Sequence, residues 1–519
     1  MIGKRRVLRT SVVGLLLFSF SLFSVLHLER IERWVLERFM VLRPNALITN
    51  LWESPSMDLN VDLYMFNWTN SEHINDPKVK PRFEEFGPYR FKETMQKLNV
   101  VWHEENSTVS YMRRSRFDFD EAASAGRLTD PMVAPNLLIV GIYQKMLSWS
   151  PMLRTVMLMM LNLYGKETTM VRPAGDWMFD GFDTALLKMS KMVPTNLMPE
   201  LNFPYEKIGY AYPRNGSMEI YGHHNVHTGR QDFDKLGQIA RWRYNNVTAS
   251  SPRCRLKGSA GEFHPIPLVK GRNISYFLPD LCRELEVDYA GTTVFEGVQA
   301  YVYRGSARNM ANGTDNPQNS CYCQENCREV RSGLLNISSC WYGAPVFASY
   351  PHFYQADPYY VDQVDGMKPD KDRHELVVIL EPKTGMTLEI KARIMASLLV
   401  DPQPSGIYRK SRRTFFPLIW ADYHVRITPD LLSYVKLMPI MEIVGKVGGC
   451  VGVALGLLML LWYPRQMLWK KHLMQKIEIN TMDTRTAPEQ MKGLEESPLL
   501  IGLQYVPAAI KEGARTSPS

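Results

Sequence analysis

The sequence lacks the short motifs that mark common catalytic sites. It contains no G-x-S-x-G, H-E-x-x-H or Walker-type pattern, and no G-x-G-x-x-G that follows a predicted strand. It also lacks a segment in which basic and aromatic residues alternate, so its formal net charge of +8 does not indicate a nucleic-acid partner. We therefore predict a protein that is neither an enzyme nor a nucleic-acid-binding protein, and we expect no cofactor or metal ion.

Two long segments lack any charged residue. The first is TSVVGLLLFSFSLFSVLHL at 10–28, and the second is VGGCVGVALGLLMLLWY at 447–463. A helix of about 20 apolar residues crosses a bilayer, a length that the first segment supplies alone and the second supplies together with 440–446. We predict two membrane spans. A cleaved signal peptide is the alternative for the first segment, which its length and the absence of a small-x-small cleavage site disfavour.

Basic residues flank both predicted spans on the side away from the middle of the chain, and such residues collect on the cytosolic side. Both termini are therefore predicted to be cytosolic, with anionic lipid head groups as partners of these charges. We expect a plasma-membrane or endosomal and lysosomal membrane protein. The predicted order is an N-terminal tail at 1–9, spans at 10–28 and 440–463, an ectodomain at 29–439 and a C-terminal tail at 464–519.

Sites of covalent modification agree with an extracellular or luminal middle segment. Six of the seven cysteines lie between Cys254 and Cys340, and an even number in an oxidising compartment favours disulfides, whose pairing the residues leave open. A zinc site at Cys321, Cys323 and Cys327 is the less favoured alternative, because no histidine accompanies these cysteines. N-x-S/T glycosylation acceptors occur only between the spans, at Asn67, Asn106, Asn215, Asn246, Asn273, Asn312 and Asn336.

Alternating apolar and polar residues predict β-strands in much of the ectodomain. In the clearest case, 374–394, two alternating runs flank a turn at 382–385 and predict a hairpin. A largely antiparallel sheet or barrel is expected. Shorter strands are predicted at 61–66, 89–91, 100–102, 108–112, 219–221 and 293–302.

One region has helical periodicity instead, with helices predicted at 136–147, 151–164 and 183–191. The second helix is apolar almost all round, but its 14 residues are too few to cross a bilayer. It is expected to be buried or to contact a lipid or a partner. Ten of the 29 methionines lie between Met146 and Met198. Ordinary core packing is preferred over an apolar ligand surface as their explanation.

Two shorter patterns concern the second span and its tail. Gly448, Gly452 and Gly456 lie four residues apart and predict a face for helix packing, with a homo-oligomer as one expectation and merely permissive composition as the alternative. The tail at 477–519 is predicted to be disordered. Within it, Glu495, Leu499 and Leu500 resemble an acidic dileucine sorting signal read by clathrin adaptors, and a chance match is the alternative.

Several longer motifs together resemble the class B scavenger receptor family, which includes fatty-acid translocase, the lysosomal integral membrane protein and the croquemort-type phagocytic receptors. The similarity extends over both spans and nearly the whole ectodomain. The motifs are YMFNWTN (64–70), FGPYRF (86–91), RPAGDWMFDGF (172–182), HTG (227–229), CYC (321–323), PHFYQADP (351–358), VDGMKPD (364–370) and LEPKTGMTLEIKARI (380–394).

The resemblance implies a mainly β fold with α-helices, in which a large antiparallel β-barrel-like ectodomain carries a helical-bundle cap at about 131–200 and is anchored by two transmembrane helices. It also implies a lipid-lined tunnel from the cap to the bilayer. Three disulfides are implied: Cys254–Cys321, Cys282–Cys340 and Cys323–Cys327. Neither tail contains a cysteine, so the palmitoylation found in some relatives is not expected here.

In relatives a basic patch on the cap receives anionic ligands, and Lys166 is the residue here that matches part of it. Lys145 and Arg154 are further candidates by sequence position, with Met157 and Met160 as candidate apolar contacts. We expect a receptor that binds fatty acids, sterols, other lipids or lipoproteins at the cap and transfers lipid toward the membrane. The alternatives are a lysosomal sorting receptor for a luminal protein and, in a different class, a two-span ligand-gated channel.

Overall fold

The computed structural model describes residues 2–55, 57–164, 167–192, 203, 205–248, 251–323, 327, 330–402 and 407–483. The chain divides into two compact units. Residues 27–445 form the first, which we call the large unit. The chain on either side of it forms the second, whose described part is two helices that we call the helix pair.

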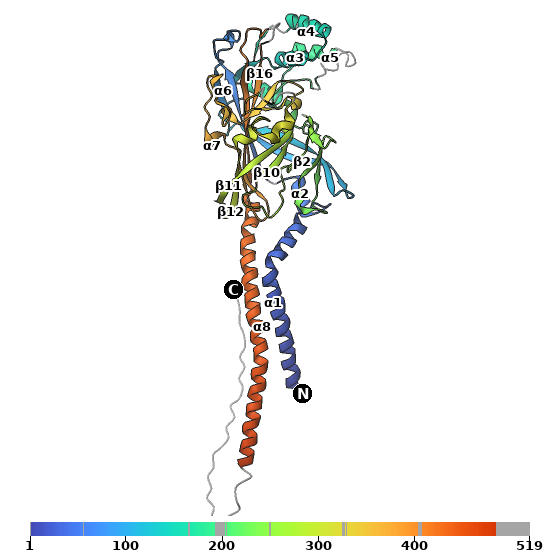
Figure 1. The fold of residues 1–519 in the computed structure, drawn as a ribbon, viewed down its shortest axis with the longest axis vertical. Helices are drawn as coiled ribbons and strands as arrows, with labels where there is room; N and C mark the ends of the chain where they lie inside the picture. Colours follow the sequence, from blue (N-terminus) through green and yellow to red (C-terminus); the bar gives the residue numbers. More distant parts are fainter. Residues whose placement is uncertain are drawn as a thin grey trace, which may run out of the picture. The chain divides into compact units, whose positions relative to one another are not determined.

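A 13-stranded antiparallel sheet forms most of the large unit (Figure 1). Its strands follow the order β10, β11, β12, β15, β16, β17, β1, β2, β3, β6 and β7, and β13 and β14 extend it beside β16. The strands are β1 (Met57–Trp68), β2 (Phe83–His103), β3 (Thr108–Phe119), β6 (His223–His227), β7 (Ile239–Trp242), β10 (Ile274–Leu278), β11 (Arg283–Phe295), β12 (Val298–Arg304), β13 (Leu335–Asn336), β14 (Val346–Ser349), β15 (Val377–Leu380), β16 (Thr387–Val400) and β17 (Thr414–Ile427).

Ser259 joins the two edge strands of this sheet. It forms one isolated bridge with Gln238, just before β7, and another with Tyr276 on β10. The Phe277 N–H donates to the Ser259 carbonyl at 2.8 Å, and the Ser259 N–H donates to the Ser275 carbonyl at 2.8 Å. The sheet therefore nearly closes on itself, which confirms the expected antiparallel, barrel-like fold.

The predicted hairpin at 374–394 is confirmed as β15 and β16, although β16 continues to Val400. Residues 89–91 and 100–102 belong to a single long strand, β2. The strand predicted at 219–221 is wrong, because these residues form a turn. Tyr221 gave this stretch the apolar residue that suggested a strand. Its ring is buried by tertiary packing instead, and it lies 4.7 Å from the guanidinium carbon of Arg113.

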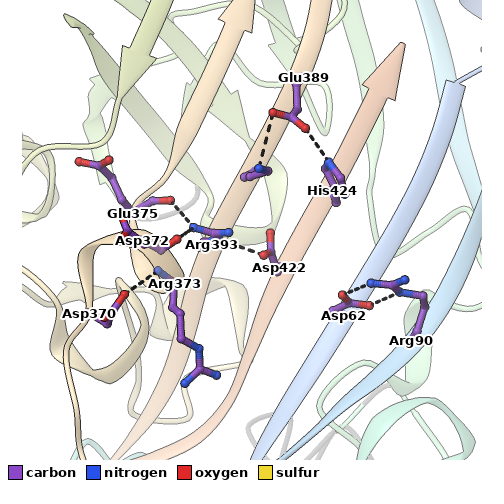
Figure 2. A network of polar contacts seen from close by, with 11 residues as sticks. Asp62, Arg90, Asp370, Asp372, Arg373, Glu375, Glu389, Arg393, Asp422 and His424 are labelled. Carbon is purple, nitrogen blue, oxygen red and sulfur yellow. Dashed lines mark hydrogen bonds and ion pairs between the residues drawn. The ribbon is translucent and has the colours of Figure 1, made fainter. Parts of the chain in front are cut away.

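A row of charged residues crosses four neighbouring strands on the outer face of the sheet (Figure 2). Arg393 on β16 donates to Asp422 on β17 at 2.9 Å, and Arg90 on β2 donates to Asp62 on β1 at 2.6 Å. Asp62 and Asp422 are register partners, and burial raises the pKa of Asp422. Because these charged side chains lie on the outer face, the residues that alternate with them along each strand point into the barrel.

Three helices gather at one end of the large unit (Figure 1). The helix predicted at 151–164 is confirmed as α4 (Pro151–Tyr164). Asn136 caps α3 (Leu137–Met146), because its Oδ1 accepts from the Ile139 N–H at 3.4 Å. The third helix, α5 (Ala185–Met192), begins later than predicted. With the two-stranded ribbon of β4 (Pro131–Pro135) and β5 (Thr169–Pro173), these helices form the cap.

The helix pair comprises the outer parts of α1 (Ile2–Met40) and α8 (Pro429–Asp483). Segments Leu8–Met40 and Pro429–Trp462 are long and apolar enough to cross a membrane. A methyl group on Gly456 would approach Phe18 Cβ to 2.7 Å, and one on Gly452 would meet Ser21, so these glycines face α1 of the same chain. A methyl group on Gly448 would meet nothing within 4 Å among the described residues outside its own helix backbone. The predicted face for helix packing is therefore occupied at Gly452 and Gly456 by the chain's own first helix, and a homo-oligomer through the three glycines stays a prediction.

The helix α8 continues to Asp483, so the prediction of disorder from residue 477 is wrong for 477–483. Between Pro464 and Asp483 the sequence contains neither glycine nor a further proline, and apolar residues favour a continuing helix. The remainder of the tail, including Glu495, Leu499 and Leu500, lies outside the described residues.

Three disulfides join Cys254 to Cys321, Cys282 to Cys340 and Cys323 to Cys327, the same pairs that the resemblance implies. Thiolates at Cys321, Cys323 and Cys327 are therefore unavailable, and the zinc alternative is wrong. Cys450, in the helix pair, is the remaining cysteine of the seven.

Candidate functional site

A pocket opens at the base of the cap, with about 1030 Å³ of empty space including its mouth. The helix α3 contributes Leu138, Gly141 and Ile142 to its lining, and α5 contributes Leu186. Ala344 faces α3, since a methyl group on Gly141 would lie 3.6 Å from its Cβ. The size and mainly apolar lining are typical of a small-molecule site.

Aromatic residues from two distant segments stand beside this lining. The hydroxyl oxygens of Tyr205 and Tyr342 are 2.7 Å apart, and Phe203 packs edge-on against both rings. Burial and this hydrogen bond raise the pKa of Tyr205. The basic side chains of the lining are those of Lys145, Lys207 and Arg214.

The inner face of the barrel carries apolar side chains that are only partly buried. Ile394, Ala421 and Tyr423 pack against the main core cluster, yet each keeps part of its surface accessible. Burial nevertheless raises the pKa of Tyr423. Each of the three therefore contributes some accessible surface to the inward face of the nearly closed sheet.

Two ion pairs also face the interior, where their charges act on Tyr423. Arg113 on β3 donates to Glu93 on β2 at 2.6 Å, and Arg214 donates to Asp280 at 2.9 Å. The buried Tyr221 has a hydroxyl without a hydrogen-bond partner among the described residues. Burial raises the pKa of this phenol to about 12, so it stays protonated at physiological pH. The interior therefore has an apolar wall and a polar wall.

The helix α4 presents an exposed apolar stripe. Met152, Val156, Met159 and Leu163 lie on one helical face and are 78%, 40%, 62% and 70% exposed. Met157, proposed from sequence as a ligand contact, is 4% exposed and belongs to the core, while Met160 is half-buried against it. The prediction that the methionines are ordinary core residues therefore holds on the inner face of α4 and fails on its exposed face.

The three basic candidates differ in their surroundings. Arg154 donates to the carbonyls of Met146 at 3.1 Å and Leu147 at 3.0 Å, so it ties α4 to the end of α3. Lys145 lines the pocket. Lys166 lies outside the described residues.

Three histidines, His223, His224 and His227, lie close together in the sequence but are not grouped as metal ligands in the structure. His224 is buried and stacks on Tyr111, and burial lowers its pKa to about 3. His223 stacks on Tyr244 instead. Within the described part of the chain, no group of three His, Cys, Asp or Glu side chains could hold a metal ion.

The seven glycosylation acceptors differ in how their amides are used. Asn67 Oδ1 accepts from the Val133 N–H at 2.8 Å. The amides of Asn215 and Asn312 donate to main-chain carbonyls at 3.3 and 3.1 Å. Asn273 donates from Nδ2 to Glu286 at 2.6 Å and to Asp288 at 2.9 Å. The other three, Asn106, Asn246 and Asn336, are exposed.

We predict that Asn273 carries no glycan in the folded protein. A glycan replaces one of the two Nδ2 hydrogens, and both are donated to carboxylates here. Enzymatic deglycosylation in ¹⁸O-labelled water followed by mass spectrometry should label Asn106, Asn246 and Asn336 and leave Asn273 unlabelled. A labelled Asn273 in correctly folded protein would contradict this assignment.

Comparison with known proteins identifies the family. The CD36 family model matches residues 12–467, which include the large unit, the second candidate span and all but the first four residues of the first candidate span. This chain belongs to the CD36 family. Protein peste of Drosophila melanogaster is 33% identical over 433 residues, covering 82% of this chain and 76% of that protein.

Two mammalian proteins are also similar to this chain. Scavenger receptor class B member 1 of Rattus norvegicus is 29% identical over 79% of this chain and 79% of its own length. Lysosome membrane protein 2 of the same species is 29% identical over 81% of this chain and 86% of its own length. The chain is therefore a membrane protein of the class B scavenger receptor type.

Sequence reasoning missed most of the pocket of this CD36-family protein. Its walls come from four segments far apart in the chain, which run from 137 to 145, from 186 to 190, from 203 to 220 and from 340 to 344. No single segment carries a recognisable pattern. The one local signal was the aromatic pair Trp341 and Tyr342 directly after the disulfide-bonded Cys340.

Proposed function

We propose that this protein is a receptor that takes up lipid at the cap and passes it through the barrel interior toward the membrane. The observation that supports this most is the apolar pocket at the base of the cap, which shares Arg214 with the interior polar wall. An acyl chain gains about 0.8 kcal/mol for each methylene removed from water, and a dry route keeps that gain.

The proposal includes the predicted topology, in which both termini are cytosolic and the large unit is the ectodomain. Lipoproteins or anionic particles would be captured on the cap, where α4 exposes Met152, Met159 and Leu163. The absence of N-x-S/T acceptors between residues 131 and 202 supports this, because no N-linked glycan would cover the cap.

A related role is sorting of a luminal protein to lysosomes. It is favoured by the similarity to Lysosome membrane protein 2 and by the exposed apolar stripe of α4, which could hold a protein partner. In either role, Glu495, Leu499 and Leu500 would bind clathrin adaptors and direct endocytosis.

Replacing Ala344 with tryptophan should reduce lipid uptake about tenfold or more while leaving particle capture unchanged, because the indole would occupy part of the pocket that Ala344 lines. The measurement compares uptake of a fluorescent lipid from lipoprotein at 37 °C with particle binding at 4 °C, in cells expressing the full chain. Leu147→Trp is the control, since Leu147 is 53% exposed on the cap and does not line the pocket. Unchanged uptake by Ala344→Trp would refute the route.

A further inference from the structure

Arg214 occupies a defined place in the pocket lining. It ends a short helical turn, Tyr212–Arg214, and two contacts hold its guanidinium. Nε donates to Asp280 Oδ1 at 2.9 Å, and Nη1 donates to the Tyr210 carbonyl at 3.1 Å. The side chain is 15% exposed. A guanidinium held in this way loses little conformational entropy when it binds a further group.

Two N–H donors in this lining lack acceptors. Nε and Nη1 of Arg214 both donate hydrogen bonds, but none of the described residues accepts one from its Nη2. The Nε1 of Trp341 is buried and likewise has no partner in the described part of the chain. The Trp341 ring centroid is 5.6 Å from the guanidinium carbon, so the indole lies beside the guanidinium. A buried donor without an acceptor costs about 1–3 kcal/mol, which a ligand oxygen would recover.

The charge of the lining has one sign. Lys145, Lys207 and Arg214 are its basic residues, and none of the described residues that line the pocket is acidic. Asp280, which pairs with Arg214, lies outside the lining. The pocket therefore combines apolar walls with an excess of positive charge, which complements an amphiphile with an anionic head.

We propose that Arg214 and Trp341 form a head-group subsite that selects amphiphiles with a carboxylate or phosphate head over neutral lipids. The inference rests on the proposed function, since a lipid must enter the pocket to reach them. The anionic oxygens accept from Arg214 Nη2 and from Trp341 Nε1, while the chain lies against the apolar residues of α3 and α5.

The test measures binding by the full chain in nanodiscs of three probes with the same hexadecyl chain: the carboxylic acid, the alkyl phosphate and the alcohol. The double variant Arg214→Met/Asp280→Asn removes the guanidinium without leaving Asp280 charged and unpaired. We expect its Kd for the acid and the phosphate to rise about 10–100-fold, as for loss of a hydrogen bond to a charged group, and its Kd for the alcohol to change less than about threefold. Trp341→Phe, which leaves the ion pair intact, should weaken acid binding about fivefold.

Lys188→Met is the matched control, because it removes a positive charge from α5 without changing the pocket lining. The Lys188 side chain is 62% exposed and pairs with Asp183 at the surface, so its loss should change acid binding less than about threefold. Equal losses for acid and alcohol, or equal effects of the Lys188 and Arg214 variants, would overturn the subsite and leave lipid binding intact. Failure of the wild-type chain to bind any probe would instead overturn the proposed function, and the subsite with it.

Discussion

Lowering the pH from about 7.5 to about 5 is expected to reduce the free energy of unfolding of the large unit by several kcal/mol, because histidines are buried there in the neutral form. Burial lowers the pKa of His374 to about 4 and that of His264 to about 4, from an ordinary value of 6.5. His374 Nδ1 accepts from the Asp370 N–H at 2.9 Å, so a second ring proton would break this bond. Below pH 6.5 the unfolded chain binds protons that the folded chain cannot, and each site costs about 1.4 kcal/mol per pH unit down to its folded pKa.

Glu85 does not add to this loss in the same range. Its carboxylate accepts from His352, Trp420 and Arg373, and these bonds outweigh its burial and lower its pKa to about 2. A carboxylate with a lowered pKa contributes stability that is present above its ordinary pKa and lost only as the pH falls toward the folded value. The contribution of Glu85 is therefore complete at pH 5.

His374→Asn provides the test, since an asparagine oxygen can accept from the Asp370 N–H without titrating. Urea titrations of the full chain in detergent, followed by tryptophan fluorescence at both pH values, should give a loss about 2 kcal/mol smaller for this variant than for wild type. His73→Asn is the control, because the His73 side chain is 52% exposed and paired with Glu72 at the surface. Identical pH slopes for wild type and His374→Asn would contradict the assignment.

Lys97→Met is expected to destabilise the large unit by about 3–5 kcal/mol, because it breaks a buried ion pair from one side. The Lys97 side chain is 1% exposed, and Nζ donates to the Trp52 carbonyl at 2.7 Å and lies 2.9 Å from Glu262. Nζ also lies 5.0 Å from the Trp52 ring centroid. Burial lowers the pKa of Lys97, and the carboxylate of Glu262 counters this effect. One ammonium thus joins α2 (Leu47–Glu53), β2 and the segment around residue 262.

The control for Lys97→Met is Lys92→Met, which changes the same residue type on the same strand. Lys92 is exposed on the outer face, so its loss should cost less than about 0.5 kcal/mol. The double variant Lys97→Met/Glu262→Gln should recover part of the stability, because it no longer leaves a carboxylate unpaired. Equal urea midpoints for the Lys97 and Lys92 variants would show that the ion pair contributes little.

The strands were predictable wherever one face meets the core and the other carries charge. In β16, Glu389, Lys391 and Arg393 point outward while Ile390 and Ile394 point inward, and this alternation is legible in the sequence. The join between the two edge strands through Ser259 was not predictable, because an isolated bridge leaves no periodic pattern.

The candidate site was less predictable than the fold because its contacts are tertiary. Position along the chain placed Arg154 beside the other basic residues, but its guanidinium caps the carbonyls at the end of α3. Arg214 and Trp341 lie 127 residues apart and meet only after the sheet closes and Cys282 joins Cys340. Spacing rules describe residues on one helix or strand, and they do not reach across such distances.

The pairing of six cysteines leaves Cys450 as the only thiol of the chain. A maleimide spin label or fluorophore can therefore be attached at one position of the wild-type protein, with no residue removed to prevent double labelling. Spectra recorded before and after a lipid is added would then show whether binding in the pocket changes the surroundings of Cys450 on α8.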